Sequence, residues 1–198
     1  MQKKITLDNE IVQVRTIQEE DFEGMLKAAM YPEIWEHMSV SLLTQEAVQT
    51  YIENAIKERQ TNQSHTFVIV NKKTNEIIGS TSFLDIAENH KRVEIGSTWI
   101  SPKYWRTNMN TNCKFLLLKY CFEELQLNRV QIKTGHENFR SQKAIERLGA
   151  TKEGILRNHM IRKEGKIRHT VMYSIIKEEW PVIKERFIGR LLANDQGM

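Results

Sequence analysis

The stretch Val-Glu-Ile-Gly-Ser-Thr-Trp-Ile-Ser-Pro-Lys-Tyr-Trp-Arg-Thr-Asn-Met-Asn-Thr-Asn, residues 93–112, decides the fold of this chain. Residues 93–100 are rich in β-formers and Pro102 stops the strand, whereas apolar side chains recur at helical spacing from Met109 onward. The first turn of such a helix leaves backbone N–H groups unpaired and carries the positive end of the helix dipole, which suits phosphate groups. The pattern predicts a phosphate cradle at Arg106, Thr107, Asn108, Met109, Asn110 and Thr111. An ordinary strand-to-helix connection with a Thr or Asn cap is the alternative.

The rest of the chain alternates between strand and helix patterns, with no repeat and no low-complexity linker. Further strands are predicted at 11–17, 65–70, 77–84, 130–134, 154–161 and 168–176, and helices at 18–30, from 44 onward, 109–125 and 141–148. We expect an α/β (α+β) protein whose mixed, mostly antiparallel sheet has about seven strands with helices on both faces. A single domain over 1–198 is predicted, with a core at 11–177 and a C-terminal tail at 178–198.

Composition narrows the class of protein but does not identify a partner. The 198 residues are 40% hydrophobic, and their formal net charge of +4 comes from Lys and Arg dispersed among Asp and Glu, which disfavours direct nucleic-acid binding. No apolar run is long enough to span a membrane and the polar start is unlike a signal peptide, so a cytoplasmic location is expected. Cys113 and Cys121 are expected to be buried reduced thiols, and no His or Cys spacing suggests a metal site.

A second motif lies downstream of the strand at 130–134. Residues 138–150 read Asn-Phe-Arg-Ser-Gln-Lys-Ala-Ile-Glu-Arg-Leu-Gly-Ala. Together with residues 93–112, this motif resembles the acetyl-CoA-binding core of the GNAT N-acetyltransferases, and within them the branch of the ribosomal-protein N-terminal acetyltransferases. The resemblance covers roughly residues 11–177. It implies a GNAT fold and direct transfer of an acetyl group from the cosubstrate acetyl-CoA to an amine, without a metal.

The same resemblance implies where the cofactor binds. The strands at 93–100 and 130–134 should run parallel and splay apart, and the pantetheine arm should bond to the backbone at Trp99 and Ile100. Asn108 stands where many GNAT proteins have Gly; Asn tolerates a left-handed backbone, but its side chain occupies space near the phosphates. Arg106 is either a phosphate partner or a solvated turn residue.

Two residues are candidates for the chemistry. Glu94, two residues before Gly96, is the predicted general base, since Gly within a strand often marks a bulge or a close approach; a solvent-facing or salt-bridged Glu is the alternative. Ile145 stands where the family commonly has a Tyr acid, so Ser141, one turn earlier, is predicted to donate to the coenzyme A sulfur. Asn138 would orient the pantetheine or cap the helix, and plain capping roles for Asn138 and Ser141 remain open.

The acceptor side is less defined. Trp35, His37 and Met38 lie between the first two predicted helices and His159 and Met160 lie on a late strand, positions that could face an amine but equally suit packing or the surface. The acceptor is expected to be a primary amine, either a protein N-terminus such as that of a ribosomal protein or a small amine or amino acid. A homodimer is left open. A non-catalytic acyl-CoA-binding or regulatory domain is the second hypothesis.

Overall fold

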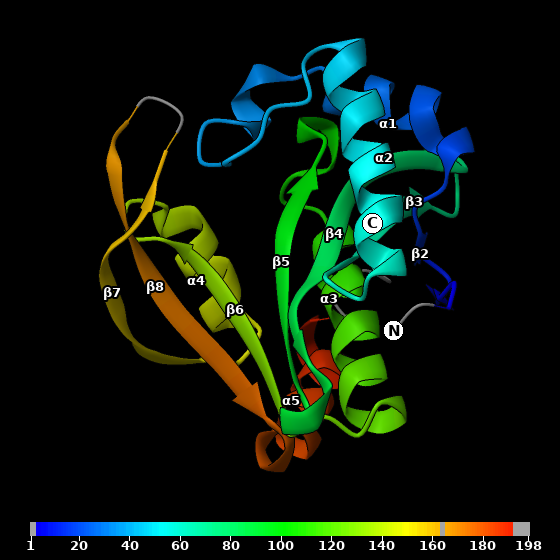
Figure 1. The fold of residues 1–198 in the computed structure, drawn as a ribbon. Helices are drawn as coiled ribbons and strands as arrows, with labels where there is room; N and C mark the ends of the chain where they lie inside the picture. The colour runs from blue at the N-terminus through cyan, green and yellow to red at the C-terminus, as the bar shows by residue number, and fades with distance from the viewer. Residues whose placement is uncertain (1–2, 163–164, 192–198) are drawn as a thin grey trace.

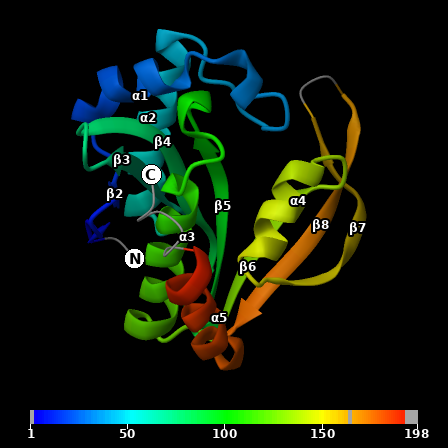
Figure 2. The same ribbon diagram turned by 180° about the vertical axis from the view of Figure 1, so that it is seen from behind.

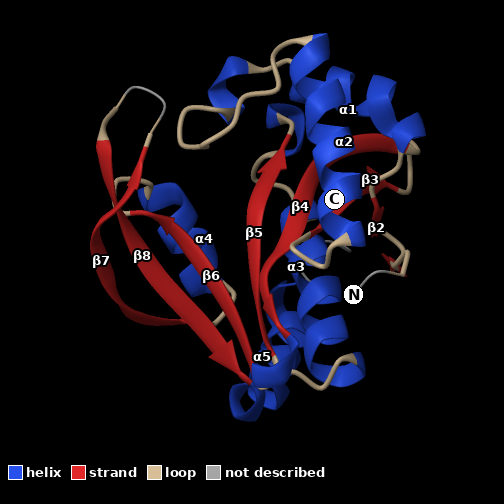
Figure 3. Ribbon diagram, in the orientation of Figure 1, coloured by secondary structure: helices blue, strands red, loops and turns tan. Residues whose placement is uncertain are grey.

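The computed structural model describes residues 3–162 and 165–191, and in this part of the chain eight strands form one sheet in the order β1-β2-β3-β4-β5-β6-β8-β7 (Figures 1 and 3). The strands are β1 (Thr6–Asp8), β2 (Val12–Thr16), β3 (His65–Asn71), β4 (Glu76–Ala87), β5 (Arg92–Ile100), β6 (Arg129–Gly135), β7 (Thr151–Ile161) and β8 (Ile167–Ile176). Neighbouring strands are antiparallel except β5 and β6, which are parallel.

Helices cover both faces of the sheet, and Figure 2 shows from behind the face opposite to that of Figure 1. Helices α1 (Phe22–Ala29) and α2 (Gln45–Gln60) lie on one face, and α3 (Met109–Lys119), α4 (Phe139–Arg147) and α5 (Trp180–Arg186) on the other. A separate apolar cluster fills the space under each group of helices. β3 lies between the two clusters, which explains why it is buried along its whole length.

The predicted fold class is confirmed, with two corrections. The sheet has β1 in addition to the seven predicted strands, and β1 has only three residues, too few to show a strand pattern. The turn that pairs β1 with β2 depends on Asn9, whose Oδ1 accepts from the N–H groups of Ile11 and Val12 at 2.9 and 3.0 Å. The helix predicted over 109–125 is α-helical only to Lys119 and ends in a π-helical turn at Tyr120–Glu124. Of the C-terminal tail predicted at 178–198, residues 180–186 form α5, and residues 192–198 lie outside the described residues.

Local capping places the helix ends. Thr44 Oγ1 accepts from the N–H of Ala47 at 3.2 Å and starts α2, as its sequence predicts. Gly149 follows α4 with φ of 98°, a left-handed conformation that suits Gly after a helix. The strand-to-helix order predicted from residues 93–112 is confirmed, so α3 begins directly after the β5 connection.

Candidate active site

A gap opens between β5 and β6. Residues 92–94 of β5 pair with residues 129–131 of β6, and no further pairing joins the two strands in the described chain. Figure 1 shows the strands diverging from this short contact, with β6 continuing beside β8. The parallel, splayed arrangement that the resemblance implied is therefore confirmed.

A bulge interrupts β5 beside this gap. Ser80 of β4 faces Trp99 and Ser82 faces Gly96, so Thr81 alone lies opposite two residues of β5, one of which, Ser97, has φ of 48°. A Cβ at Gly96 would lie 2.7 Å from Glu94 Oε1. The bulge predicted at Gly96 is thus confirmed, and the Glu94 side chain of the same strand fills the space that a Cβ there would need.

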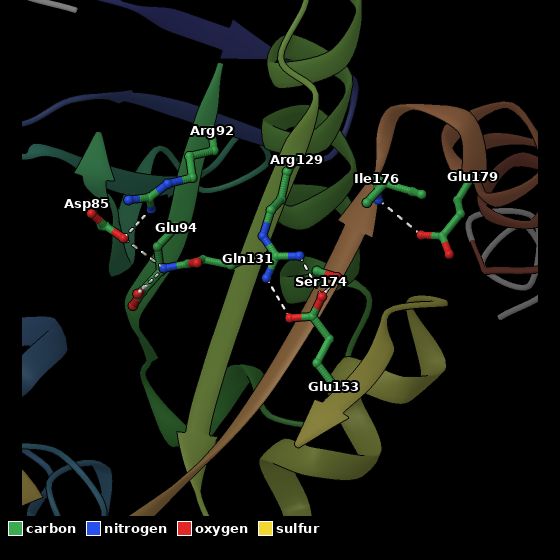
Figure 4. A network of polar contacts seen from close by, with 9 residues as sticks. All are labelled: Asp85, Arg92, Glu94, Arg129, Gln131, Glu153, Ser174, Ile176 and Glu179. Carbon is green, nitrogen blue, oxygen red and sulfur yellow. Dashed lines mark hydrogen bonds and ion pairs between the residues drawn. The ribbon is translucent and has the colours of Figure 1, made fainter. Parts of the chain in front are cut away.

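Glu94 lies at the point where the two strands separate, and its side chain is only 1% exposed. Its Oε2 accepts from Lys133 Nζ at 2.9 Å and from Gln131 Nε2 at 3.2 Å. Gln131 also donates to Asp85 at 3.1 Å, and Asp85 is paired with Arg92 (Figure 4). Glu94 is therefore salt-bridged and buried; the solvent-facing alternative is wrong.

Figure 4 also shows a separate network further along the sheet, where Arg129 makes two 2.5 Å hydrogen bonds to Glu153 and Ser174 donates to the same carboxylate at 2.9 Å. At the end of β8, Ile176 N donates to Glu179 at 3.0 Å. Figure 4 shows Gln131 of β6 between this network and Glu94 of β5. Glu153 therefore offers a comparison carboxylate in the same sheet.

Lys114 is a buried cation that the sequence reasoning missed. It lies on α3 with a side chain 5% exposed, and its Nζ donates to Thr98 Oγ1 at 2.7 Å; Thr98 in turn shares a 2.8 Å hydrogen bond with Thr81. Burial lowers its pKa to about 8, against the opposing influence of Cys113 and Glu94. The available signal was a lysine within the apolar helical run Cys-Lys-Phe-Leu-Leu-Leu.

The loop before α3 has a conformation different from the one expected. Arg106 is exposed and left-handed, with φ of 62°, whereas Asn108 has φ of −74° in the right-handed helical region. The left-handed residue of this loop is thus Arg106, and the tolerance of Asn for that conformation is not used at Asn108. Thr107 Oγ1 stabilises the loop, because it donates to Tyr104 O at 2.7 Å and accepts from Met109 N at 3.4 Å.

The first turn of α3 retains polar atoms without partners. Within the described residues, no hydrogen bond uses the N–H of Asn110 or Thr111, and the buried Oδ1 of Asn110 has no partner. Acetyl-CoA carries phosphate oxygens that suit free N–H groups and also amide and hydroxyl donors that suit a free carbonyl. The free N–H groups and the free carbonyl oxygen therefore fit acetyl-CoA, whose phosphates the sequence predicts at this turn.

The backbone beside the gap is only partly free. Ser101 N donates to Ile78 O at 2.8 Å on β4, and because successive backbone groups of a strand point to opposite edges, those of Ile100 point to the gap. The Ile100 carbonyl accepts from Trp105 Nε1 at 2.7 Å, which leaves its N–H for a ligand. Trp99 is buried against Trp35, with ring centroids 5.2 Å apart.

The start of α4 matches the predicted cap. Asn138 Oδ1 accepts from Ser141 N at 3.0 Å, so the capping role of Asn138 is confirmed. Ser141 is partly buried, and its hydroxyl makes no hydrogen bond to any described residue. Ile145, one turn later, is 6% exposed and packs in the core. An apolar side chain there cannot donate a proton, which leaves Ser141 as the hydroxyl on this face.

Two contacts hold α4 against the α3 side of the gap. The Arg140 guanidinium lies 4.1 Å from the centre of the Trp105 ring, and Arg147 Nη2 donates to Thr111 Oγ1 at 3.1 Å. Ser141 on α4 therefore lies on a helix that contacts α3, which carries the phosphate candidates Asn110 and Thr111. Their separation in the sequence gave no direct sign of these contacts.

The weaker acceptor-side candidates lie in different surroundings, some packed in the core and one exposed. Trp35 is buried and its Nε1 donates to Ala29 O at 3.0 Å, which supports the packing alternative. His37 has a buried Nδ1 without a partner among described residues, and Met38 packs partly against the core under α1 and α2. His159 is exposed and its Nδ1 lies 3.0 Å from Thr170 Oγ1.

Other chemistries find no support in the described residues. Cys113 and Cys121 are fully buried and free, and burial raises the pKa of Cys113 to about 11. Residues 3–162 and 165–191 hold no group of three or more His, Cys, Asp or Glu side chains suited to a metal ion. Among the helices described, none has the length and apolar character needed to cross a membrane.

The fold and the arrangement of strands around the gap are those of an acetyltransferase domain. Residues 12–151 match the acetyltransferase (GNAT) domain family, so the chain belongs to the GNAT acetyltransferases. The uncharacterized N-acetyltransferase p20 of Bacillus licheniformis is 28% identical over 176 residues, which are 88% of this chain and 98% of that protein. YdaF of Bacillus subtilis (strain 168), named as a proposed ribosomal N-acetyltransferase, is 33% identical over 104 residues, 52% of this chain and 56% of that protein. The crystal structure of a GCN5-related N-acetyltransferase from Brucella melitensis shares the fold, with a TM-score of 0.89 at 23% identity over 96% of this chain and 86% of that one.

Proposed function

We propose that this chain is an acetyl-CoA-dependent N-acetyltransferase that transfers the acetyl group directly to a primary amine. The observation that carries the proposal is the gap between β5 and β6. The buried carboxylate of Glu94 lies where the two strands separate, and the first turn of α3, which follows β5 in the chain, has backbone N–H groups without partners. Acetyl-CoA would supply the activated acetyl group as a thioester. The free N–H groups of Asn110 and Thr111 would bind its phosphates, and the N–H of Ile100 its pantetheine arm.

The residues divide the chemistry between them. Glu94 accepts the proton that the amine loses as its nitrogen forms the new bond to the acetyl carbon. The bond from that carbon to sulfur breaks, and the Ser141 hydroxyl donates a hydrogen bond to the departing thiolate, which then takes up a proton, ultimately from solvent. The Lys133 ammonium lies 2.9 Å from the buried Glu94 carboxylate and holds it at the point where the strands separate.

The acceptor is a protein N-terminus, such as that of a ribosomal protein, or a small amine or amino acid. The name of the YdaF relative favours the former. A non-catalytic acyl-CoA-binding domain is the competing function, because Ile145, where the resemblance implies a Tyr acid, is a buried apolar side chain that cannot donate a proton.

Two measurements test the proposal. Acetyl-CoA should raise the melting temperature by binding the native state, with saturation at micromolar concentrations. A thiol-release assay with a panel of amines should then detect turnover above the rate without acceptor. A thermal shift without turnover would favour the non-catalytic domain, and no shift at millimolar acetyl-CoA would remove both.

A further inference from the structure

One face of the sheet collects cations beside Glu94. Side chains at alternate positions of β6 share the face of Glu94, as the contacts of Gln131 and Lys133 demonstrate. Gly135 continues that face, and a Cβ placed there would lie 3.3 Å from Arg168 Nε on β8. Arg168 therefore lies on the Glu94 face, over the only side-chain-free position in this row of β6.

Arg168 has no partner in the described chain. Its Nε is buried without a hydrogen bond, and no ion pair or hydrogen bond engages the rest of its guanidinium. Neighbouring Arg162 differs, since its Nη2 lies 3.1 Å from Glu137 Oε2. Lys133 likewise pairs with Glu94. Arg168 is thus a partly buried cation whose charge the described residues leave uncompensated.

The electrostatic surroundings agree with this geometry. Burial is the largest influence that lowers the pKa of Arg168, and the charge of Arg162 lowers it further, while Glu94 opposes both. Glu94 is therefore close enough to affect Arg168, although Lys133 occupies the carboxylate directly. A guanidinium held beside a second cation, without an anion of its own, strongly favours an anionic ligand.

The position of Arg168 suits an acceptor and not the cofactor. Val93, Ile95 and Ile132 alternate along the strands with Glu94 and Lys133, and they pack in the core under α3 and α4. α3 and α4, which carry the candidate cofactor residues and whose arrangement Figure 2 shows, therefore cover the face opposite to that of Glu94. Figure 1 shows β7 and β8 on the other side of the gap from the segment between α1 and α2. A ligand entering from this side would meet Arg168 and Glu94 together.

We propose that Arg168 binds a carboxylate on the acceptor, so that the preferred acceptors are primary amines bearing a carboxylate near the amine. This inference rests on the proposed N-acetyltransferase function and specifies its substrate class. The planar guanidinium pairs with a carboxylate through two parallel hydrogen bonds, which fixes the orientation of the acceptor as well as its affinity. The carboxylate can come from a free amino acid or from an acidic side chain near the start of a polypeptide.

The test compares matched acceptors that differ only in this charge. One pair is an amino acid and its carboxamide, such as alanine and alaninamide; the other is a pair of peptides with Asp or Asn at the second position. The variants are Arg168→Gln, the conservative Arg168→Lys, and Arg157→Gln as a control for an exposed arginine on β7. Wild type and Arg157→Gln should prefer the carboxylate acceptor in at least one pair by about 10- to 100-fold in kcat/KM.

Arg168→Gln should abolish that preference through a higher KM for the carboxylate acceptor, with an unchanged KM for acetyl-CoA and an undiminished melting temperature. Arg168→Lys should restore part of it. The pair that shows the preference identifies the source of the carboxylate. Equal rates within both pairs in wild type, or a preference that survives Arg168→Gln, would overturn the inference while leaving acetyl transfer intact.

A binding measurement separates this inference from the proposed function. N-acetylalanine, a product that cannot be acetylated again at nitrogen, should bind wild type and Arg157→Gln in calorimetry, and Arg168→Gln at least tenfold more weakly. If wild type acetylates no amine but Arg168→Gln still weakens the binding of N-acetylalanine, the result would support the carboxylate site and defeat the proposed transferase function. If the amino-acid pair shows the preference, equal binding of N-acetylalanine and its carboxamide by wild type would defeat the site. If the peptide pair shows it, equal binding of the acetylated Asp and Asn peptides would defeat the site.

Discussion

Lys133 on β6 lies 2.9 Å from Glu94 on β5, just beyond the last pair of residues that the two strands share. The ion pair therefore bridges the strands where the gap begins. Glu94 is nearly inaccessible, whereas Lys133 remains 29% exposed, so the pair has one buried and one accessible member. This relationship makes the role of Glu94 testable separately from its contribution to stability.

Glu94→Gln should lower kcat/KM by about 10²- to 10⁴-fold, the usual contribution of a general base, while the affinity for acetyl-CoA stays nearly unchanged. The change also leaves the Lys133 ammonium unpaired and should destabilise the fold. The double variant Glu94→Gln, Lys133→Met should recover stability but not activity, and Glu153→Gln serves as the control carboxylate. Activity that returns together with stability would identify Glu94 as structural.

Ser141→Ala should slow acetyl transfer by about one to three orders of magnitude without loss of stability, since its hydroxyl is free to donate to the leaving sulfur. Asn138→Ala should instead cost about 1 kcal/mol of unfolding free energy, because it removes the cap of α4. Urea unfolding and steady-state kinetics measure the two effects. Wild-type rates in Ser141→Ala with a good acceptor would defeat its assignment.

Arg106→Gly should stabilise the protein by about 1 kcal/mol, because Gly adopts φ of 62° without the strain of a side chain. Arg106→Ala removes the same charge without that relief and should not stabilise. If Arg106 pairs with a phosphate, both variants should raise the KM for acetyl-CoA equally. Asn108→Gly should give no stability gain, since Asn108 has helical angles; a gain there would contradict this account of the loop.

Lys114 should make stability depend on pH with a defined sign. Its pKa falls from the usual 10.5 to about 8 on folding, so between these values the unfolded chain binds more protons at Lys114 and its contribution to the unfolding free energy rises with pH. Below about pH 8 Lys114 is charged in both the folded and the unfolded chain, so the full free-energy cost of burying its ammonium is present. Lys114→Met removes this cost, so the variant's advantage over wild type should shrink by up to about 3 kcal/mol toward pH 10.5.

Urea unfolding of both proteins at pH 7 and pH 10 measures this change. Lys119→Met, at an exposed position of the same helix, is the matched control and should show no such trend. A difference between Lys114→Met and wild type that is constant with pH would contradict the burial of a titrating ammonium.

The sequence by itself determined the local elements of this protein. The cap at Asn138, the left-handed Gly149 and the bulge beside Gly96 were readable because each depends on the conformational preferences of a few consecutive residues. The order of strands and helices followed from hydrophobic periodicity. β1 was missed for the same reason, since its three residues depend on pairing with β2 for their conformation.

Only the tertiary structure decided which charges meet. Glu94 and Lys133 come from different strands, Lys114 reaches Thr98 from a helix, and Arg168 lies over Gly135 without a partner. Coulombic and hydrogen-bonding energies depend on separation and burial in space, and no local pattern records either for residues far apart in the chain. For that reason the sequence could propose Glu94 as a base, but the ion pair that surrounds it and the free cation beside it emerged only when the strands were placed side by side.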